Sequence, residues 1–372
     1  MTDTILRKRI ETALHRADVV IDGKRPWDIQ VKNSRLYRRV LAQGSLGFGE
    51  AYMDGWWDSD SPDQLLTRLL KARLDEQFKS LVVYLAALKV KFLNCQSVKR
   101  AYQVGEKHYN VGNDLYGRML DARMIYSCGY WNKAQTLDES QEHKLELSCQ
   151  KLHLKEGQRV LDVGCGWGGT ARYMAENYGV EVVGITISTA QADLARENCR
   201  DLPVEIRVQD YRDLHGSFDR IVSIGMFEHV GYRNYSTYFK KMRELLKDDG
   251  LFLLHTIGGN TPSERTDPWI DRYIFPNGMI PSSQQISSSF EGYFVLEDWH
   301  NFGLDYDKTL MSWYENFESS WSEIKKNYDE RFRRMWRYYL LTCAGSFRSR
   351  NNQLWQIILS KQGLPAGYNF PR

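Results

Sequence analysis

The chain has 372 residues, of which 42% are hydrophobic and 13% aromatic. This composition excludes a disordered chain, and the length predicts more than one domain. The 50 Lys and Arg residues nearly balance the 47 Asp and Glu residues, so a surface built as a whole for nucleic acid is excluded. The first 100 residues carry 18 basic and 12 acidic side chains, which predicts that any basic surface is N-terminal.

The cysteines indicate a reduced, cytoplasmic protein without a metal site. They form no C-x-x-C pair and no cluster with the spacing of zinc ligands; the six are Cys95, Cys128, Cys149, Cys165, Cys199 and Cys343. The N-terminus lacks an apolar segment of signal-peptide length. The longest apolar run, Leu81–Leu88, is too short for a bilayer, which needs ~20 residues. We expect no membrane span, while contact with a membrane surface stays open.

Residues 1–77 predict a small, mostly helical N-terminal domain. Ser61 as N-cap, Pro62 in the first turn and Gln64 reaching back to the cap predict the start of a helix. A stripe of leucines with helical spacing follows and should be buried: Leu65, Leu66, Leu69, Leu70 and Leu74.

Two features of this region suit lipid contact but also have structural explanations. Trp56 and Trp57 come after glycine-rich turns and fit either core packing, which we favour, or an anchor at a lipid interface. Residues 78–100 combine an apolar stretch with lysines and predict a linking helix. Such a helix could lie on an anionic membrane or simply connect two domains.

Strands and helices alternate from about residue 155 onward. This order predicts an α/β fold, a doubly wound and mostly parallel sheet, within a domain over residues 101–372. The predicted strands fall within 159–169, 180–188, 218–226 and 250–258, with helices over 191–200 and 238–247 between them. Aromatic-rich segments from Pro262 onward are predicted to be helical and to cap the carboxyl edge of the sheet.

The segment Asp162–Gly169 predicts a nucleotide-binding turn. Gly164, Gly166 and Gly168 satisfy both G-x-G-x-G and G-x-G-x-x-G, so the glycines alone fit either a dinucleotide or a methyl donor. A dinucleotide site needs an acidic residue at the end of the second strand, and residues 184–188 contain none. This absence favours S-adenosylmethionine, with a tight turn that binds nothing as the alternative.

Polar residues around the turn suit the two ends of that donor. Backbone N–H groups and the Asp162 carboxylate would hold the amino-acid end. The rest of the turn and the segment after the next strand complete the predicted binding residues: Trp167 and Gly168 in the turn, then Gln209, Asp210 and Tyr211 near the adenine.

The chain resembles the cyclopropane fatty acid synthases, in particular the bacterial type that acts on phospholipids. The resemblance covers nearly the whole chain, including segments that other methyltransferases would not share: VKNSRLYRRVLAQGSLGFGEAYMDGWW, GEKHYNVGNDLY, MIYSCGYW, VLDVGCGWGG, FDRIVSIGMFEHVG, DPWIDRYIFPNG and VLEDWHNFGLDYDKTLMSWYENF. It implies a methyltransferase-type sheet behind an N-terminal accessory domain. It also implies a homodimer that works at the inner membrane surface on unsaturated phospholipids.

The resemblance assigns residues to both halves of the site. Contacts to S-adenosylmethionine are implied for Tyr126, Ser127, Gly164, Gly166, Thr186, Gln191, Gln209 and Asp210. Family enzymes add a methylene group to a cis double bond through a carbocation, and a bound bicarbonate ion removes the proton. The residues implied to hold that ion are Cys128, Glu228, His255, the backbone of Ile257, and Tyr306.

Each catalytic candidate also has a structural explanation. Glu228 and His255 follow predicted strands, where open sheets bind ligands, but Glu228 could cap a helix and His255 could be a hydrogen-bonded core residue. Cys128 could be a buried, apolar-like thiol, and Tyr306 could pack under the cap. His229 is a competing acid or base.

The alternative from another class of function is a lipid-binding protein that has lost catalysis. The presence of Cys128, Glu228, His255 and Tyr306 together favours an enzyme. Within the enzymes, the same cation could instead give methyl-branched chains.

Overall fold

The computed structural model describes residues 3–74 and 112–370. The predicted linking helix over 78–100 and the boundary at residue 77 lie outside the described residues, so the predicted division of the chain stays a prediction. Contacts group the chain into two compact units, each discontinuous in sequence. The helical unit comprises Met1–Asn94, Thr266–Pro276 and Tyr306–Asn352, and the sheet unit comprises Cys95–Arg265, Asn277–Asp305 and Gln353–Arg372.

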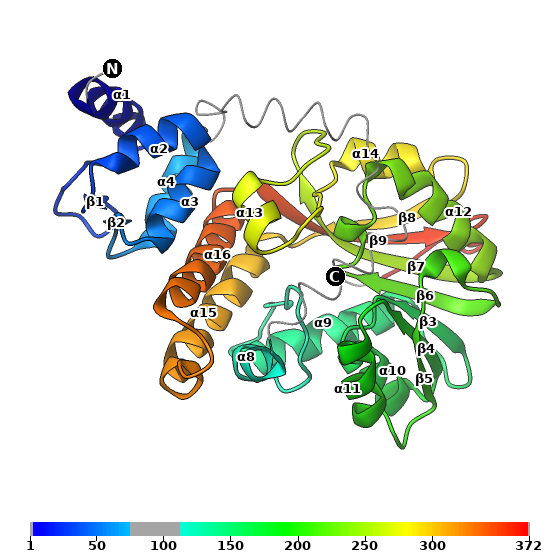
Figure 1. Ribbon diagram of the computed structural model, residues 1–372. Coiled ribbons are helices and arrows are strands. Elements are labelled where there is room, and N and C mark those ends of the chain that lie inside the picture. The colour runs from blue at the N-terminus through cyan, green and yellow to red at the C-terminus, as the bar shows by residue number, and fades with distance from the viewer. Residues whose placement is uncertain (1–2, 75–111, 371–372) are drawn as a thin grey trace. The chain divides into compact units, whose positions relative to one another are not determined.

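The helical unit combines N-terminal helices with helices from the last third of the chain (Figure 1). Its elements are α1 (Asp3–Arg16), β1 (Gln30–Val31), α2 (Arg35–Gln43), α3 (Ser45–Met53), β2 (Trp57–Asp58), α4 (Pro62–Lys71), α13 (Pro268–Tyr273), α15 (Leu304–Ile324) and α16 (Glu330–Arg348). Helix α16 packs against α3 and α4. Its Arg334 donates hydrogen bonds to the carbonyls of Tyr52 and Trp57. Segments far apart in sequence therefore share one core.

Helix α4 begins where the sequence predicts, but its cap differs from the prediction. Ser61 is the N-cap residue and Pro62 opens the helix, yet the Ser61 side chain makes no capping hydrogen bond. Instead, its backbone N–H donates to the Pro26 carbonyl at 2.7 Å, which holds Ser61 in the preceding loop. Of the leucine stripe, Leu65, Leu66 and Leu74 are buried as expected, whereas Leu69 and Leu70 are half-buried.

The two tryptophans differ in burial, and only the core-packing prediction can be checked. Trp57 is fully buried, donates from its indole to the Phe48 carbonyl at 3.0 Å and stacks on the Phe48 ring. Trp56 is half-buried and lies beneath the guanidinium groups of Arg35 and Arg39, at 4.7 and 4.8 Å. Core packing is thus confirmed for Trp57.

The sheet unit is built on a seven-stranded sheet in the order β5-β4-β3-β6-β7-β9-β8. Its strands are β3 (Arg159–Val163), β4 (Glu181–Thr186), β5 (Val204–Val208), β6 (Phe218–Ile224), β7 (Leu246–Gly259), β8 (Val295–Asn301) and β9 (Asn352–Ser360). Strands β3 to β7 pair in parallel, and β8 pairs antiparallel with β9. The predicted doubly wound, mostly parallel fold is confirmed.

The strands β8 and β9 correct the expectation that everything beyond Pro262 is helical. The run Ile357–Leu359 is completely buried and lies in a sheet flanked by apolar clusters. Short runs of this kind fit a buried strand as well as a buried helix, because neither shows a polar side.

Helices cover both faces of the sheet (Figure 1), and alternate strand residues pack against different helices. The helices of the unit are α8 (Asn113–Met119), α9 (Leu137–Lys151), α10 (Gly169–Tyr178), α11 (Thr189–Asn198), α12 (Tyr235–Leu245) and α14 (Ser283–Phe290). Val160 packs with residues of α9 and α10, whereas Leu161 and Val163 pack with residues of α12 and α14. This alternation follows from the two-residue period of a strand and covers both faces.

Candidate functional site

Strand order reverses between β3 and β6, and open sheets bind ligands beside such a point, at the carboxyl ends of the strands. The glycine turn leaves β3 there. Gly164 has a φ of 89°, and an added Cβ would lie 2.8 Å from Cβ of Met226, so both its conformation and its packing require glycine. Gly166 and Gly168 also have positive φ angles, and Gly168 precedes α10.

Asp162 lies at the end of β3, with 2% of its surface exposed. Its Oδ2 has no hydrogen-bond partner among the described residues. Burial raises the pKa of this carboxyl to about 7, although the charge of Lys144 acts in the opposite direction. A buried carboxylate oxygen that lacks a partner fits the ammonium group of an amino-acid moiety.

Tyr126 and Ser127 lie in the segment before α9. The ring of Tyr126 packs edge-on against Tyr116. Ser127 is buried; its Oγ accepts a hydrogen bond from Nζ of Lys144 at 3.0 Å, and its carbonyl accepts one from Gln141 at 2.8 Å. Helix α9 therefore fixes this segment through two side chains.

Dinucleotide sites place a ribose-binding acidic residue at the end of the second strand. Here a neutral pair of side chains lies at that position. Thr186, at the end of β4, donates from Oγ1 to Oε1 of Gln191 at 3.0 Å, and both side chains are buried. The bond leaves the amide N–H groups of Gln191 to donate elsewhere. Gln209 joins this end, since its backbone N–H donates to the Thr186 carbonyl.

The remaining predicted donor contacts have structural partners of their own. Asp210 forms an ion pair with Arg212 at 2.7 Å and caps the short helix that begins at Tyr211. The Trp167 indole donates to Oδ1 of Asn113 at 3.2 Å. These bonds shape the wall of the site, and direct contact with a donor stays a prediction for each of the three.

Glu228 lies just beyond β6 and is buried. Its Oε1 accepts a hydrogen bond from the backbone N–H of Ile257 at 2.7 Å, while Oε2 is buried without a partner in the described chain. The Ile257 N–H is thus bonded to Glu228, and a contact of the Ile257 backbone with an anion stays a prediction. Burial raises the pKa of Glu228 to about 7. The carboxyl can thus exchange a proton near neutral pH.

His255 lies in β7, opposite Ile224 of β6. Its Nδ1 is 3.3 Å from Nε2 of Gln356, and its own Nε2 is buried without a partner in the described ranges. Burial holds the pKa of His255 well below its usual range, with the charges of Lys144 and Lys151 acting in the same direction. His255 is therefore a neutral imidazole at pH 7.

The remaining catalytic candidates are Cys128, His229 and Tyr306. Cys128 is fully buried and its thiol donates to the Gly129 carbonyl at 3.1 Å. Burial lowers the pKa of His229 to about 4, so it is neutral at pH 7. Tyr306 belongs to the helical unit, where its ring packs against Phe347 at 4.6 Å, and its part in an anion site stays a prediction.

Two buried polar residues near these candidates, Lys144 and Gln356, were not predicted from the sequence. Lys144 has no exposed surface, and burial lowers its pKa to about 8. The signal would be a lysine among the apolar positions of a helix, but no helix was predicted over residues 137–151. Gln356 carries no such signal, because its partner His255 is 101 residues away.

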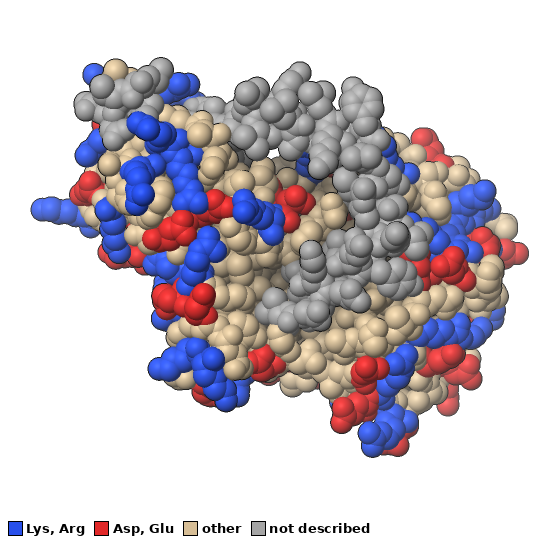
Figure 2. Space-filling model, in the orientation of Figure 1, with Lys and Arg blue, Asp and Glu red and all other residues tan. Residues whose placement is uncertain are grey.

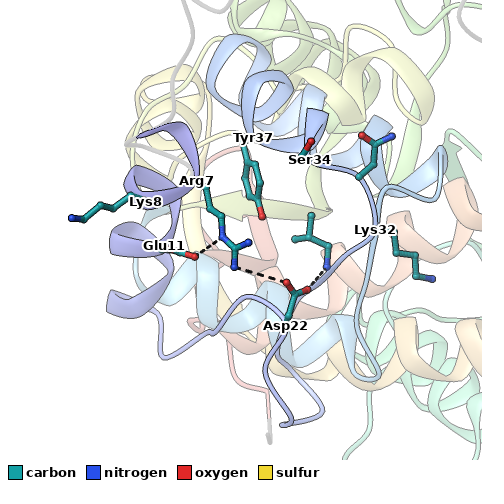
Figure 3. A pocket seen from close by; sticks show the side chains of 9 residues that line it. Arg7, Lys8, Glu11, Asp22, Lys32, Ser34 and Tyr37 are labelled. Atoms are coloured by element: carbon teal, nitrogen blue, oxygen red, sulfur yellow. Dashed lines mark hydrogen bonds and ion pairs between the residues drawn. The ribbon is translucent and has the colours of Figure 1, made fainter. Parts of the chain in front are cut away.

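A separate hollow of about 660 Å³ lies in the helical unit (Figure 3). Arg7 reaches across it to Glu11 at 2.7 Å and toward Asp22 at 4.0 Å, so acidic partners offset this cation. Lys8 and Lys32 also line it. None of the predicted site residues does.

Figure 2 shows Lys and Arg side chains gathered over the N-terminal helices, with acidic side chains among them. No helix within the described ranges is long and apolar enough to span a membrane. Residues 3–74 and 112–370 contain no group of three or more His, Cys, Asp or Glu side chains that could hold a metal ion.

The strand order, the glycine turn and the buried carboxylate beside it define an S-adenosylmethionine-dependent methyltransferase. A sequence profile of the family described as mycolic acid cyclopropane synthetase matches residues 96–357. The chain belongs to this family, which confirms the resemblance found in the sequence.

Two sequence relatives and one solved structure are similar to most of this chain. It is 55% identical, over 94% of its length and 91% of the relative, to the cyclopropane-fatty-acyl-phospholipid synthase of Escherichia coli K12. It is 32% identical to the tuberculostearic acid methyltransferase UfaA1 of Mycobacterium tuberculosis, over 89% of this chain and 82% of that one. A solved structure of the mycolic acid cyclopropane synthase CmaA1, complexed with SAH and CTAB, matches with a TM-score of 0.66 and 31% identity, over 70% of this chain and 98% of that chain.

Proposed function

We propose that the protein transfers a methylene group from S-adenosylmethionine to the cis double bond of unsaturated phospholipid acyl chains and so forms a cyclopropane ring. The observation that carries this proposal is a set of buried polar atoms without partners among the described residues, in the sheet unit: Oδ2 of Asp162, Oε2 of Glu228 and Nε2 of His255. Buried polar groups are ordinarily paired, so such atoms suit bound ligands. The E. coli relative's name supports the substrate class.

The residues at the carboxyl ends of β3 and β4 fit the methyl donor. When bound, S-adenosylmethionine supplies an electrophilic methyl group. Asp162 would hold the ammonium group, and the N–H groups of the turn at Gly164 and Gly166 would face the carboxylate. The amide of Gln191 would donate to the ribose, while Gln209, Asp210 and Tyr211 would border the adenine. Tyr126, Ser127, Thr186, Trp167 and Gly168 would complete the wall.

The residues after β6 and in β7 fit a small anion. Bicarbonate, when bound, supplies a base without placing a basic side chain beside a cation. Glu228 would share a proton with it through Oε2, His255 would face it, and the backbone of Ile257 fixes Glu228. Cys128 would complete the cradle. Tyr306 is assigned by the resemblance alone.

The chain's own contribution to the rate is positioning and exclusion of water. An alkene is a weak nucleophile, so holding it against the donor in a dry site supplies effective concentration. Water would capture a carbocation as an alcohol. Phe227, Tyr235 and Tyr238 form a fully buried aromatic cluster directly before Glu228 and along α12, which keeps that side of the site dry.

The proposed location is the cytoplasm, with the protein bound peripherally at the surface of the inner membrane. The N-terminal excess of basic residues supports attraction to anionic lipid headgroups. The five cysteines in the described ranges are all free, in keeping with a reducing compartment. Assembly as a homodimer rests on the family resemblance alone.

The test is a product analysis with purified protein, S-adenosylmethionine and phospholipid vesicles that contain a cis-unsaturated chain. We expect acyl chains heavier by one CH₂, together with S-adenosylhomocysteine, and no product from saturated vesicles. Folded protein that binds the donor but forms no product would contradict the proposal.

A second candidate product is a methyl-branched chain, because one relative is a tuberculostearic acid methyltransferase. Mass does not distinguish a cyclopropane chain from a methyl-branched chain that keeps a double bond, because both products are heavier than the substrate by one CH₂. Proton NMR does, because cyclopropane protons resonate upfield of other aliphatic protons. Signals from a branch methyl group in place of ring protons would favour this second product.

A further inference from the structure

Helix α9 presents an unusual buried polar face to the sheet. Lys144, Ser148 and Lys151 are spaced by four and three residues, so they share one side of the helix. All three are buried, although lysine is seldom fully buried without partners. A capping box at Thr136 fixes the start of the helix and with it the position of this face.

Each hydrogen bond along this face has a defined donor and a defined acceptor. The hydroxyl of Ser148 donates to the Lys144 carbonyl at 2.7 Å, so its one hydrogen is already used. Nε2 of Gln356 lies 3.0 Å from the same Ser148 oxygen and must therefore donate to it. This bond orients the amide of Gln356 with its nitrogen toward Ser148.

The orientation of that amide decides which nitrogen of His255 carries the proton. Nε2 of Gln356 has a second hydrogen and lies 3.3 Å from Nδ1 of His255. A neutral imidazole has one N–H, so if Nδ1 accepts from Gln356 the proton must be on Nε2. The reverse amide orientation would require the Ser148 hydroxyl to leave the Lys144 carbonyl and donate to the amide oxygen. In the orientation that these bonds set, Oε1 of Gln356 is buried without a partner among the described residues.

We propose that Gln356 is a positioning residue which holds His255 in the tautomer protonated at Nε2. The buried Nε2–H, which has no partner among the described residues, is thereby offered as a hydrogen-bond donor to the anion. His255 then binds and orients the anion and does not itself remove the proton. This inference rests on the proposed function and adds the residue that sets the form in which His255 acts.

The surroundings of His255 support a neutral donor. Lys144 and Lys151 both lie on α9, and their positive charges oppose a third positive charge on the imidazole. Lys151 is itself paired with Asp298 at 3.2 Å. Ring protonation is thus disfavoured from the α9 side, which leaves the choice of tautomer to Gln356.

The first test reads the tautomer directly. Long-range ¹H–¹⁵N spectra of protein labelled at its eight histidines distinguish a bare ring nitrogen from an N–H nitrogen. The signals of His255 are those that vanish in His255→Asn. We expect a bare Nδ1 and a protonated Nε2 in the wild type, and a protonated Nδ1 in Gln356→Glu, because a carboxylate can only accept there.

The second test measures turnover on unsaturated vesicles. Loss of an orienting partner of this kind typically lowers activity about 10- to 100-fold, and we expect a fall of that order in kcat for Gln356→Glu, with the affinity for S-adenosylhomocysteine unchanged. Gln356→Met removes the donor without adding a charge and should lower kcat less. The matched control is Gln353→Met, also in β9, whose side chain bonds Asn301 and Asn260.

The outcomes separate the two proposals. A protonated Nδ1 in the wild type, or turnover in both Gln356 variants equal to that of Gln353→Met, would overturn the role of Gln356. A wild-type protein with the expected tautomer that forms no product would instead contradict the proposed function. If Gln356→Glu does not fold, the wild-type spectrum and Gln356→Met still decide the question.

Discussion

Asp162 and Glu228 are two buried carboxyl groups whose pKa values are shifted in the same direction by the same cause, burial. Burial raises the pKa of each to about 7, so each can be neutral or charged near physiological pH. The two groups are proposed to use this condition differently. Asp162 must be charged to hold an ammonium group, whereas Glu228 must exchange a proton with an anion.

The first prediction follows from the sign of this shift at Asp162. An ammonium ligand favours the charged carboxylate, so the affinity for S-adenosylhomocysteine should fall as the pH drops below about 7, by at most tenfold per pH unit. Isothermal titration between about pH 5 and 8 measures this slope. Asp162→Asn should bind weakly with little slope, and an unchanged slope in this variant would contradict the role of Asp162.

Lys144 provides a check on the same prediction. Its positive charge lowers the pKa of Asp162. Lys144→Met should therefore move the pH at which affinity declines to a higher value. A midpoint that stays in place would show that Lys144 does not act on the carboxylate.

The second prediction concerns Glu228 and its neighbour. Glu228→Gln keeps the shape but cannot exchange a proton, and general acid–base groups contribute about 10²- to 10⁴-fold, so kcat should fall by that order. Donor binding should be retained. His229→Gln is the matched control and should change kcat little; a larger loss from His229→Gln would transfer the role to His229.

At the scale of elements, the connection from β3 to α10 shows how backbone geometry builds the site. Gly164 has a left-handed backbone and a neighbouring side chain 2.8 Å from the place of a Cβ. We predict that Gly164→Ala lowers donor affinity at least about tenfold, because the turn must shift. Gly157→Ala is the control, since it has a similar φ of 77° but open space around it. Calorimetric titration compares them; equal affinities would contradict the prediction.

The elements also show what the sequence could and could not predict. Strands β3 and β6 were predictable, because apolar runs end in a glycine turn or before Glu228. Strands β8 and β9 were not, since a short buried run such as Ile357–Leu359 has no periodicity that separates strand from helix. The contact of Gln356 with His255 follows from that missed pairing, so it could not be predicted either.

At the scale of the molecule, the unequal distribution of charge predicts salt-dependent membrane binding. The first 100 residues carry the basic excess, and salt shortens the reach of exposed charges to a Debye length of about 8 Å at 0.15 M. Binding to anionic vesicles should weaken as salt rises, as vesicle co-sedimentation would show. Neutral vesicles are the control. Salt-independent binding would indicate purely apolar docking.

The two compact units follow the order of the chain only in part. Motifs located Asp162, Thr186 and Glu228 because these residues lie at or just beyond the ends of strands of one sheet. The helical unit was not visible as a whole, because its N-terminal helices and α16 are separated by most of the chain. The hydrogen bond from Arg334 to the Trp57 carbonyl joins residues that are 277 positions apart in the sequence, and a local sequence pattern cannot predict such a contact.

This separation has a consequence for synthesis. The first helices leave the ribosome long before α16 exists to cover their apolar side. At 5–20 residues per second, translating the intervening 277 residues takes roughly 14 to 55 s. During that interval the nascent N-terminal segment carries an uncovered apolar surface, which makes it a natural client for chaperones and a weak point for aggregation when the protein is overproduced.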